Sequence, residues 1–289
     1  AVAGEGERAF ARIDALEDAH EEAAATLVPG ENGAGVARAV TALFEELRSL
    51  TQGIYLIREC SPRSRDAVLS FGERLATLVI TAAAREAGMD AELLDSRTLV
   101  RTNTEFGSAS PDMDETSRLT RGRISPRAGH LYVTQGFIGA TADGVTTTLG
   151  RGGSDYTATI LGAVLDAESV EIWTDVDGIM TSDPRVIPEA QTIPFISYDE
   201  AAELAYFGAK VVHPYTILPA VRREIPVWVK NTGHPEQPGT RIQTTTEGGG
   251  IRALASKNDI TLITVQSSRM LTATGSRLTW WRRARSRCP

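Results

Sequence analysis

The sequence has little of what metal-binding and disulfide-stabilised proteins need. Its 289 residues include two cysteines, Cys60 and Cys288, and four scattered histidines. The cysteines lack CxxC spacing and the histidines form no HExxH pair, so neither a zinc knuckle nor a disulfide framework is indicated. We therefore expect no metal site built from the protein's own side chains.

Positive charge and long apolar runs are also scarce. A net charge of −7 argues against a nucleic-acid or anionic membrane surface, because either would favour a basic face. We find no apolar run near the roughly 20 residues that span a membrane, and the polar, acidic first residues do not resemble a secretory signal. With 42% hydrophobic residues, the chain is expected to form one or two cytoplasmic globular domains.

Hydrophobic periodicity predicts three helices before any convincing strand, over about residues 5–28, 35–50 and 62–86. Short strands are predicted at 91–95 and 98–102, followed by a polar loop with one helix at about 112–121. Beyond residue 130, strands alternate with helices. The strands are predicted at 130–139, 145–149, 169–175 and 226–230, and the helices at 154–165, 198–209 and 214–223. This alternation indicates an α/β fold with a mainly parallel sheet.

A glycine-rich loop, residues 150–155, lies between a β-prone run and an apolar helix. Glycines let a backbone approach an anion, and the first N–H groups of the following helix point at it. Ser154 and Asp155 are candidates to cap that helix. Arg151 suits a carboxylate or phosphate, and Asp155 suits an ammonium group, so the loop favours an amino-acid substrate. The spacing is not GxGxxG, which argues against a dinucleotide fold.

The sequence offers no histidine near this loop to act as a general base. A substrate carboxylate needs none, because it is already ionised at pH 7. Catalysis would then depend on positioning and on neutralising phosphate charge.

Five segments in the same order resemble aspartokinase of the amino-acid kinase family. They are residues 70–73 (Ser-Phe-Gly-Glu), 101–103 (Arg-Thr-Asn), 130–158, 173–185, and 207–214 (Phe-Gly-Ala-Lys-Val-Val-His-Pro). The resemblance implies a carbamate kinase-like three-layer fold. It also implies ATP-dependent phosphorylation of the side-chain carboxylate of L-aspartate to 4-phospho-L-aspartate, the first step toward lysine, threonine and methionine. Mg²⁺ would be carried by the nucleotide.

The resemblance assigns roles to residues on two sides of the site. On the substrate side, Glu73 and Asp155 would hold the ammonium group, and Arg151 with Ser154 would hold a carboxylate. Arg151 and Asp155 are the candidate catalytic residues. The nucleotide side would consist of Gly152, Gly153, Thr174, Asp175, Met180, Arg185, Lys210 and Val211. Met180 stands where relatives often have an aromatic residue.

Several of these residues also fit ordinary structural roles. Glu73 could be a solvated helix residue, Asp175 and Asp177 could be turn formers, and Lys210 a cation at a helix C-terminus. His213 fits a structural role better than a catalytic one. Phe106 fits both the wall of the aspartate pocket and packing within its loop.

The resemblance also divides the chain into parts. Residues 1–245 would be a catalytic domain without its N-terminal strands, because the family's opening Lys-Phe-Gly-Gly-Thr-Ser loop does not occur here. Residues 251–276 would start a truncated ACT regulatory domain, through which family members form homo-oligomers. Residues 277–289, rich in Arg and Trp, would be an anomalous tail without a folding role. We expect an incomplete enzyme with little activity.

Two other functions fit the same residues. One is a related amino-acid kinase activity on glutamate or a nucleoside monophosphate. The other is a non-catalytic protein that binds an effector such as lysine or threonine without turning over ATP.

Overall fold

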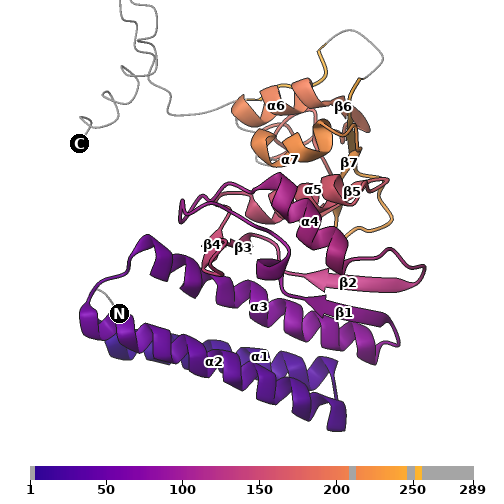
Figure 1. The fold of residues 1–289 in the computed structure, drawn as a ribbon. Coiled ribbons are helices and arrows are strands. Elements are labelled where there is room, and N and C mark those ends of the chain that lie inside the picture. The colour runs from indigo at the N-terminus through magenta and orange to yellow at the C-terminus, as the bar shows by residue number, and fades with distance from the viewer. Residues whose placement is uncertain (1–3, 208–212, 246–250, 256–289) are drawn as a thin grey trace, which may run out of the picture. The chain divides into compact units, whose positions relative to one another are not determined.

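Three long helices begin the computed structural model, which describes residues 4–207, 213–245 and 251–255. They are α1 (Gly6–Leu27), α2 (Glu31–Ile57) and α3 (Pro62–Glu86), shown in indigo and purple in Figure 1. Their apolar faces pack around Phe44, which is fully buried. The predicted bounds of α1 and α3 are confirmed. Helix α2 continues past its predicted end because Thr51 and Ile54 remain on its buried face.

Helix α3 begins as its sequence predicts. The Ser61 side chain accepts a hydrogen bond from the Ser64 N–H at 3.1 Å, and Pro62 is the first helical residue. By length and composition this helix could span a membrane, contrary to our reading of the apolar runs. Such evidence is weak, because core helices meet the same criteria. Here Phe71, Leu75 and Val79 of α3 are buried in the three-helix core.

A parallel pair and an antiparallel pair of strands follow the helices. Strand β1 (Asp90–Leu94) pairs in parallel with β2 (His130–Thr134), and β3 (Ile138–Ala140) pairs antiparallel with β4 (Thr146–Thr148). Helix α4 (Met113–Arg123) lies between β1 and β2 in the chain. The strand predicted at 98–102 was wrong: residues 96–98 form a 3-10 turn, with only isolated bridges at Arg101 and Thr102. The strand predicted at 130–139 is divided: β2 ends at Thr134 and β3 begins at Ile138, with Phe137 at a φ of 68° in the turn between them.

A four-stranded sheet contains the rest of the described strands, in the order β5-β7-β8-β6. Its pairs β5–β7 and β6–β8 are parallel, and β7–β8 is antiparallel, so the α/β class is confirmed with a mixed sheet. The core of this sheet includes the fully buried Val227, Val229 and Ile242. The strands are β5 (Val170–Thr174), β6 (Phe195–Ser197), β7 (Val227–Asn231) and β8 (Thr240–Gln243).

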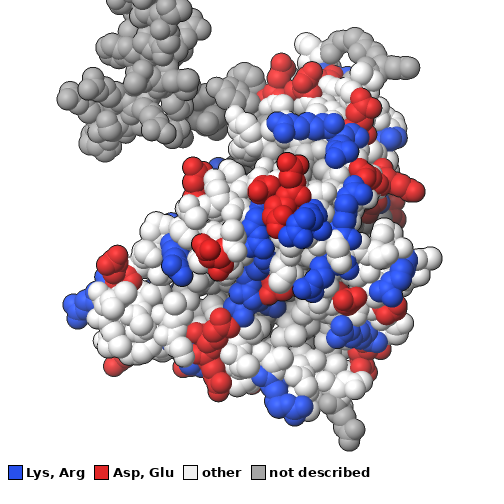
Figure 2. Space-filling view, viewed as in Figure 1, with Lys and Arg blue, Asp and Glu red and all other residues white. Residues whose placement is uncertain are grey.

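Three helices accompany this sheet: α5 (Gly153–Val164), α6 (Tyr198–Phe207) and α7 (Pro214–Val221). Helices α5 and α7 pack against each other. Figure 2 shows acidic and basic side chains intermixed on the viewed face. The described residues belong to one compact unit. Apart from residues 251–255, the predicted ACT segment and the tail lie outside the described residues.

Candidate active site

The glycine-rich loop carries the chain from β4 into α5. Gly150 and Gly152 have φ values of 79° and 69°, a left-handed conformation that disfavours other residues. Gly152 is the N-cap of α5, and the Tyr156 N–H donates to its carbonyl oxygen at 2.9 Å. Ser154, proposed above as a cap, lies instead in the first turn of the helix, as does Asp155. Neither side chain is therefore used for capping.

Two other segments pack directly on this loop. An added Cβ on Gly136 would lie 3.0 Å from the Ser154 Cα, so the segment after β2 touches the start of α5. An added Cβ on Gly152 would lie 2.9 Å from Cγ2 of Thr216 and 3.7 Å from Cβ of His213. The start of α7 therefore also packs against the loop. His213 contacts the loop as a structural neighbour, in the role that the sequence favoured.

The charged residues of the loop have no partners within the described part of the chain. Arg151 is exposed and Asp155 is half-buried, and neither forms a hydrogen bond or ion pair through its side chain with another described residue. Burial raises the pKa of the Asp155 carboxyl above its ordinary value. A half-buried carboxylate without a donor is a natural site for a ligand's cationic group.

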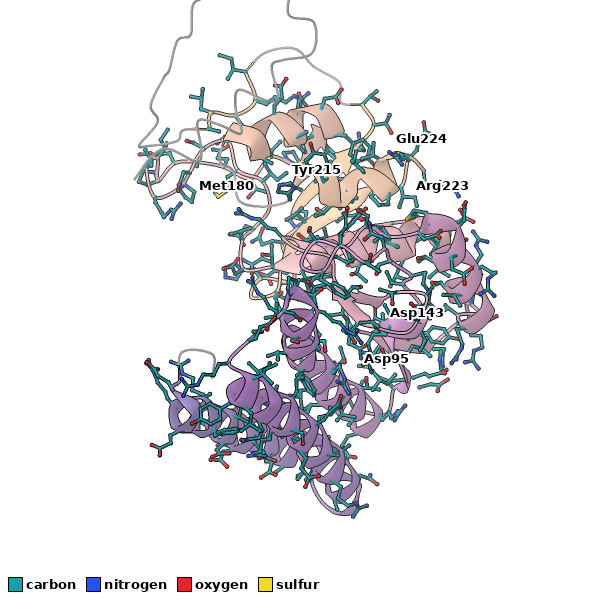
Figure 3. The ribbon with its side chains drawn as sticks, turned by 60° about the vertical axis from the view of Figure 1, so that its left-hand side comes forward. Asp95, Asp143, Met180, Tyr215, Arg223 and Glu224 are labelled. Atoms are coloured by element: carbon teal, nitrogen blue, oxygen red, sulfur yellow. The ribbon has the colours of Figure 1, made fainter. Side chains whose placement is uncertain are left out.

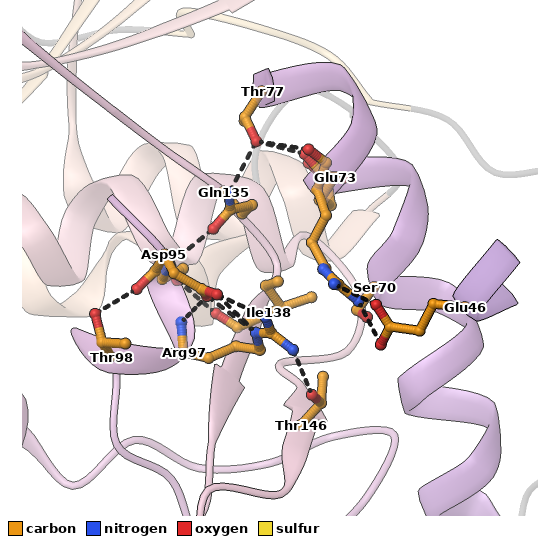
Figure 4. A network of polar contacts seen from close by, with 12 residues as sticks. Glu46, Ser70, Glu73, Thr77, Asp95, Arg97, Thr98, Gln135, Ile138 and Thr146 are labelled. Carbon is orange, nitrogen blue, oxygen red and sulfur yellow. Dashed lines mark hydrogen bonds and ion pairs between the residues drawn. The ribbon is translucent and has the colours of Figure 1, made fainter. Parts of the chain in front are cut away.

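Glu73 of α3 is, like Asp155, a half-buried carboxylate. Its carboxylate has no partner among the described residues, and burial raises its pKa. Thr77, one turn later, donates to the Glu73 carbonyl oxygen at 2.7 Å and accepts from Nε2 of Gln135 at 2.8 Å (Figure 4). Gln135 precedes Gly136, which packs on Ser154. The structure thus connects the Glu73 turn of α3 to the glycine loop through two residues.

Gln135 itself is a residue whose role the sequence did not reveal. It is buried, and its Oε1 accepts from the Ser96 N–H at 2.8 Å while its Nε2 donates to Thr77. One side chain therefore joins α3, the turn after β1 and the segment after β2. Its position in the Thr-Gln-Gly-Phe segment, which is part of the resemblance, is the sequence signal that could have indicated this role.

Half of the eight residues predicted to contact the nucleotide lie at the end of β5 or in the segment after it. Thr174 ends β5, and its hydroxyl donates to the Asp175 carboxylate at 3.1 Å. Met180 forms an isolated antiparallel bridge with Thr192 and is labelled in Figure 3. Gly153 begins α5. Lys210 and Val211 lie outside the described residues.

Arg185 is not held toward a phosphate in this structure. Its guanidinium contacts the carboxylate of Asp183, at 2.7 Å between Nη2 and Oδ2 and 3.0 Å between Nε and Oδ1. This pairing raises the pKa of Arg185 further. The side chain of Arg185 is 81% exposed and that of Asp183 is 36% exposed, so a phosphate could compete for the guanidinium at small cost.

Asp177 forms specific side-chain contacts, whereas the sequence suggested that it only forms a turn. Its Oδ1 accepts from Nδ2 of Asn231 at 2.6 Å and lies 2.9 Å from Nδ1 of His234. These contacts tie the segment after β5 to the end of β7. The His234 contact lowers the pKa of Asp177, and the Asp177 contact raises the pKa of His234.

An α/β fold with a glycine loop, a helix start and unpaired charged groups beside it is typical of a small-molecule kinase. The model of the Amino acid kinase family matches residues 5–231, and the chain belongs to this family. Within it, the chain is similar to aspartokinases. Lysine-sensitive aspartokinase 3 of Escherichia coli (strain K12) is 45% identical over 238 residues, which are 80% of this chain and 53% of that protein. Aspartokinase 1, chloroplastic, of Arabidopsis thaliana is 37% identical over 80% of this chain and 42% of its own length.

The solved structures agree with this result. E. coli aspartokinase III in complex with aspartate and ADP has a TM-score of 0.79 and 42% identity, covering 87% of this chain and 55% of that chain. Clostridium acetobutylicum aspartate kinase has a TM-score of 0.62 and 29% identity, covering 74% and 46%. The chain spans about half the length of these relatives.

Proposed function

We propose that this chain binds L-aspartate and ATP and transfers the γ-phosphoryl group to the side-chain carboxylate of aspartate. The products are 4-phospho-L-aspartate and ADP. The observation that carries the proposal is a set of charged groups without a partner among the described residues: Arg151 and Asp155 of the glycine loop and Glu73 of α3. The two protein carboxylates can hold the single ammonium group of aspartate, and the guanidinium can hold one of its two carboxylates.

The chemistry requires no general base. An oxygen of the ionised aspartate side chain attacks the γ-phosphorus, and the bond from the γ-phosphorus to the bridging oxygen of ADP breaks. Arg151 is proposed to hold a substrate carboxylate, with Ser154 beside it, while Glu73 and Asp155 hold the ammonium group. Gly152 and Gly153 leave room for the phosphates at the start of α5.

The nucleotide is proposed to lie along the segment after β5, with Thr174 and Asp175 at the carboxyl end of the strand, where ligands of such sheets bind. Arg185 would exchange Asp183 for a phosphate, and Lys210 would approach the phosphates from the segment before α7. No group of three His, Cys, Asp or Glu that could hold a metal occurs among the described residues. We therefore assign Mg²⁺ to the ATP phosphates, whose charge it would neutralise.

The remaining expectations from the sequence stay predictions. They are the low turnover of this chain, its assembly through ACT domains, and its cytoplasmic location. The relatives include a bacterial enzyme and plant enzymes named as chloroplastic.

Aspartyl phosphate can be trapped with hydroxylamine to test the proposed reaction. We expect an acyl hydroxamate with L-aspartate and ATP, and none with L-glutamate as acceptor. An Arg151→Ala variant serves as the background, because a trace of contaminating kinase would survive that substitution. Product no higher than in this variant would contradict the proposal. Binding of lysine or threonine in a thermal-shift titration without any transfer would favour an effector-binding protein instead.

A further inference from the structure

A fully buried carboxylate lies on α3, outside the residues assigned to the substrate. Asp66 is 0% exposed. Its Oδ2 accepts from the N–H of Gly107 at 2.9 Å and of Thr148 at 2.8 Å, and its Oδ1 accepts from the Thr148 hydroxyl at 2.9 Å. All three donors are neutral, and Asp66 forms no ion pair within the described residues. A buried polar side chain is costly unless its polar atoms are hydrogen-bonded, and here both carboxyl oxygens of Asp66 accept hydrogen bonds.

The three contacts join segments that meet at the glycine loop. Thr148 is the last residue of β4, two residues before Gly150. Gly107 belongs to the loop 103–110, and its carbonyl oxygen lies 3.1 Å from the position of an added Cβ on Gly150. The Ala109 N–H donates to the carbonyl oxygen of Thr148 at 2.9 Å. Asp66 thus fixes the backbone from which Arg151 projects, together with the loop beside it.

Asp66 also lies on the same face of α3 as Glu73. The two residues are seven positions apart, which is two turns of an α-helix. The Asp66 face contacts β4, and the Glu73 turn contacts Gln135 through Thr77.

We propose that Asp66 is a positioning residue for the amino-acid substrate, which holds α3, the loop 103–110 and the end of β4 in the arrangement that aligns Glu73 with Arg151. The inference rests on the proposed function for the identity of the ligand. We expect the effect on the aspartate side, because the three hydrogen bonds of Asp66 go to Gly107 and Thr148 and none goes to the described segment after β5, where Thr174, Asp175, Met180 and Arg185 are proposed to hold the nucleotide. Gly152 and Gly153 are the proposed nucleotide residues that share the glycine loop.

Two substitutions of Asp66 separate geometry from charge. In Asp66→Asn, the amide oxygen can accept from both N–H groups while the amide nitrogen donates to Thr148 Oγ1, whose hydroxyl hydrogen turns away. Asp66→Ala loses all three contacts. The matched control is Thr81→Val, which removes a buried hydroxyl of α3 whose hydrogen bond, to the Thr77 carbonyl oxygen, stays within the helix.

The readouts are the dissociation constants of L-aspartate and ADP, measured by calorimetry, and the amide exchange rate of Ala109, measured by NMR. Ala109 reports on the loop without touching Asp66. For Asp66→Ala we expect about tenfold weaker L-aspartate binding, ADP binding within about twofold, and faster exchange at Ala109. Asp66→Asn and Thr81→Val should resemble the unmodified chain.

The outcomes distinguish this inference from the proposed function. Faster exchange with unchanged L-aspartate affinity, or equal losses for L-aspartate and ADP, would overturn a role on the substrate side. Unchanged exchange in Asp66→Ala would overturn the positioning itself. If the unmodified chain binds no L-aspartate, the proposed function fails, while the exchange rate of Ala109 still decides whether Asp66 holds the loop.

Discussion

Replacement of Gly152 by alanine should destabilise the chain in two separable ways. The φ of 69° at this position places a Cβ in the left-handed region, at a cost of about 1–2 kcal/mol. The added Cβ would also lie 2.9 Å from Cγ2 of Thr216, closer than ordinary van der Waals contact. Overpacking of this kind costs about 1–3 kcal/mol. We therefore expect Gly152→Ala to lower the free energy of unfolding by about 2–5 kcal/mol.

Gly144→Ala is the matched control that measures the cost of the left-handed backbone conformation alone. Gly144 has a φ of 77°, and an added Cβ there would meet nothing within 4 Å. We expect this variant to lose only about 1–2 kcal/mol. Urea unfolding followed by far-UV circular dichroism measures both variants.

The contact with Thr216 is tested by a double-mutant cycle. Thr216→Ser removes Cγ2 but keeps the hydroxyl that donates to the His213 carbonyl oxygen at 2.6 Å. The double variant should be more stable than the sum of the single effects by about 1 kcal/mol. Additive effects, or equal losses for Gly152→Ala and Gly144→Ala, would refute the claim that α7 packs tightly on the glycine loop.

Three further predictions concern Glu73, His234 and Phe44. Glu73→Gln should leave the stability to urea at neutral pH unchanged or raise it, because burial penalises a carboxylate that has no partner among the described residues. Calorimetry should show that L-aspartate binding is lost, and a clear loss of stability would contradict this reasoning. Because Asp177 raises the pKa of His234, their contact should stabilise the fold below the ordinary pKa of histidine and be lost as pH rises through the raised value. His234→Ala should therefore destabilise the chain at about pH 5.5 but not at about pH 8.5, and equal effects at both would refute the link. Phe44→Ala should cost about 3–5 kcal/mol in urea unfolding, since Phe44 is fully buried among α1, α2 and α3; a loss below about 1 kcal/mol would count against that core.

Local features of the fold were predictable from the sequence. The bounds of α3 follow from Ser61, Pro62 and the apolar period, and the glycine loop follows from the order of strand, glycines and helix. Strands β6 and β8, of three and four residues, were missed, because the alternation of apolar residues did not indicate either of them. The cap of α5 was misassigned because Gly152 takes the left-handed conformation, which leaves Ser154 inside the helix.

The contacts that shape the candidate site were not predictable, because they join distant parts of the chain. Asp66 reaches partners 41 and 82 residues away, and Gln135 reaches 58 residues back to Thr77. No local pattern indicates that such side chains are buried together. The pairing of Arg185 with Asp183 is local, but the resemblance assigned Arg185 to the nucleotide phosphates, so Asp183 was not predicted as its partner.

The central claim is that Glu73, Arg151 and Asp155 form a site for an amino acid. Calorimetric titration of the chain with L-aspartate and with succinate tests it most directly, because succinate keeps both carboxylates and lacks the ammonium group. Loss of a charged contact of this kind typically weakens binding about tenfold or more, so we predict a difference of that size in favour of L-aspartate. Equal affinity for the two ligands, or no binding of L-aspartate, would contradict the account.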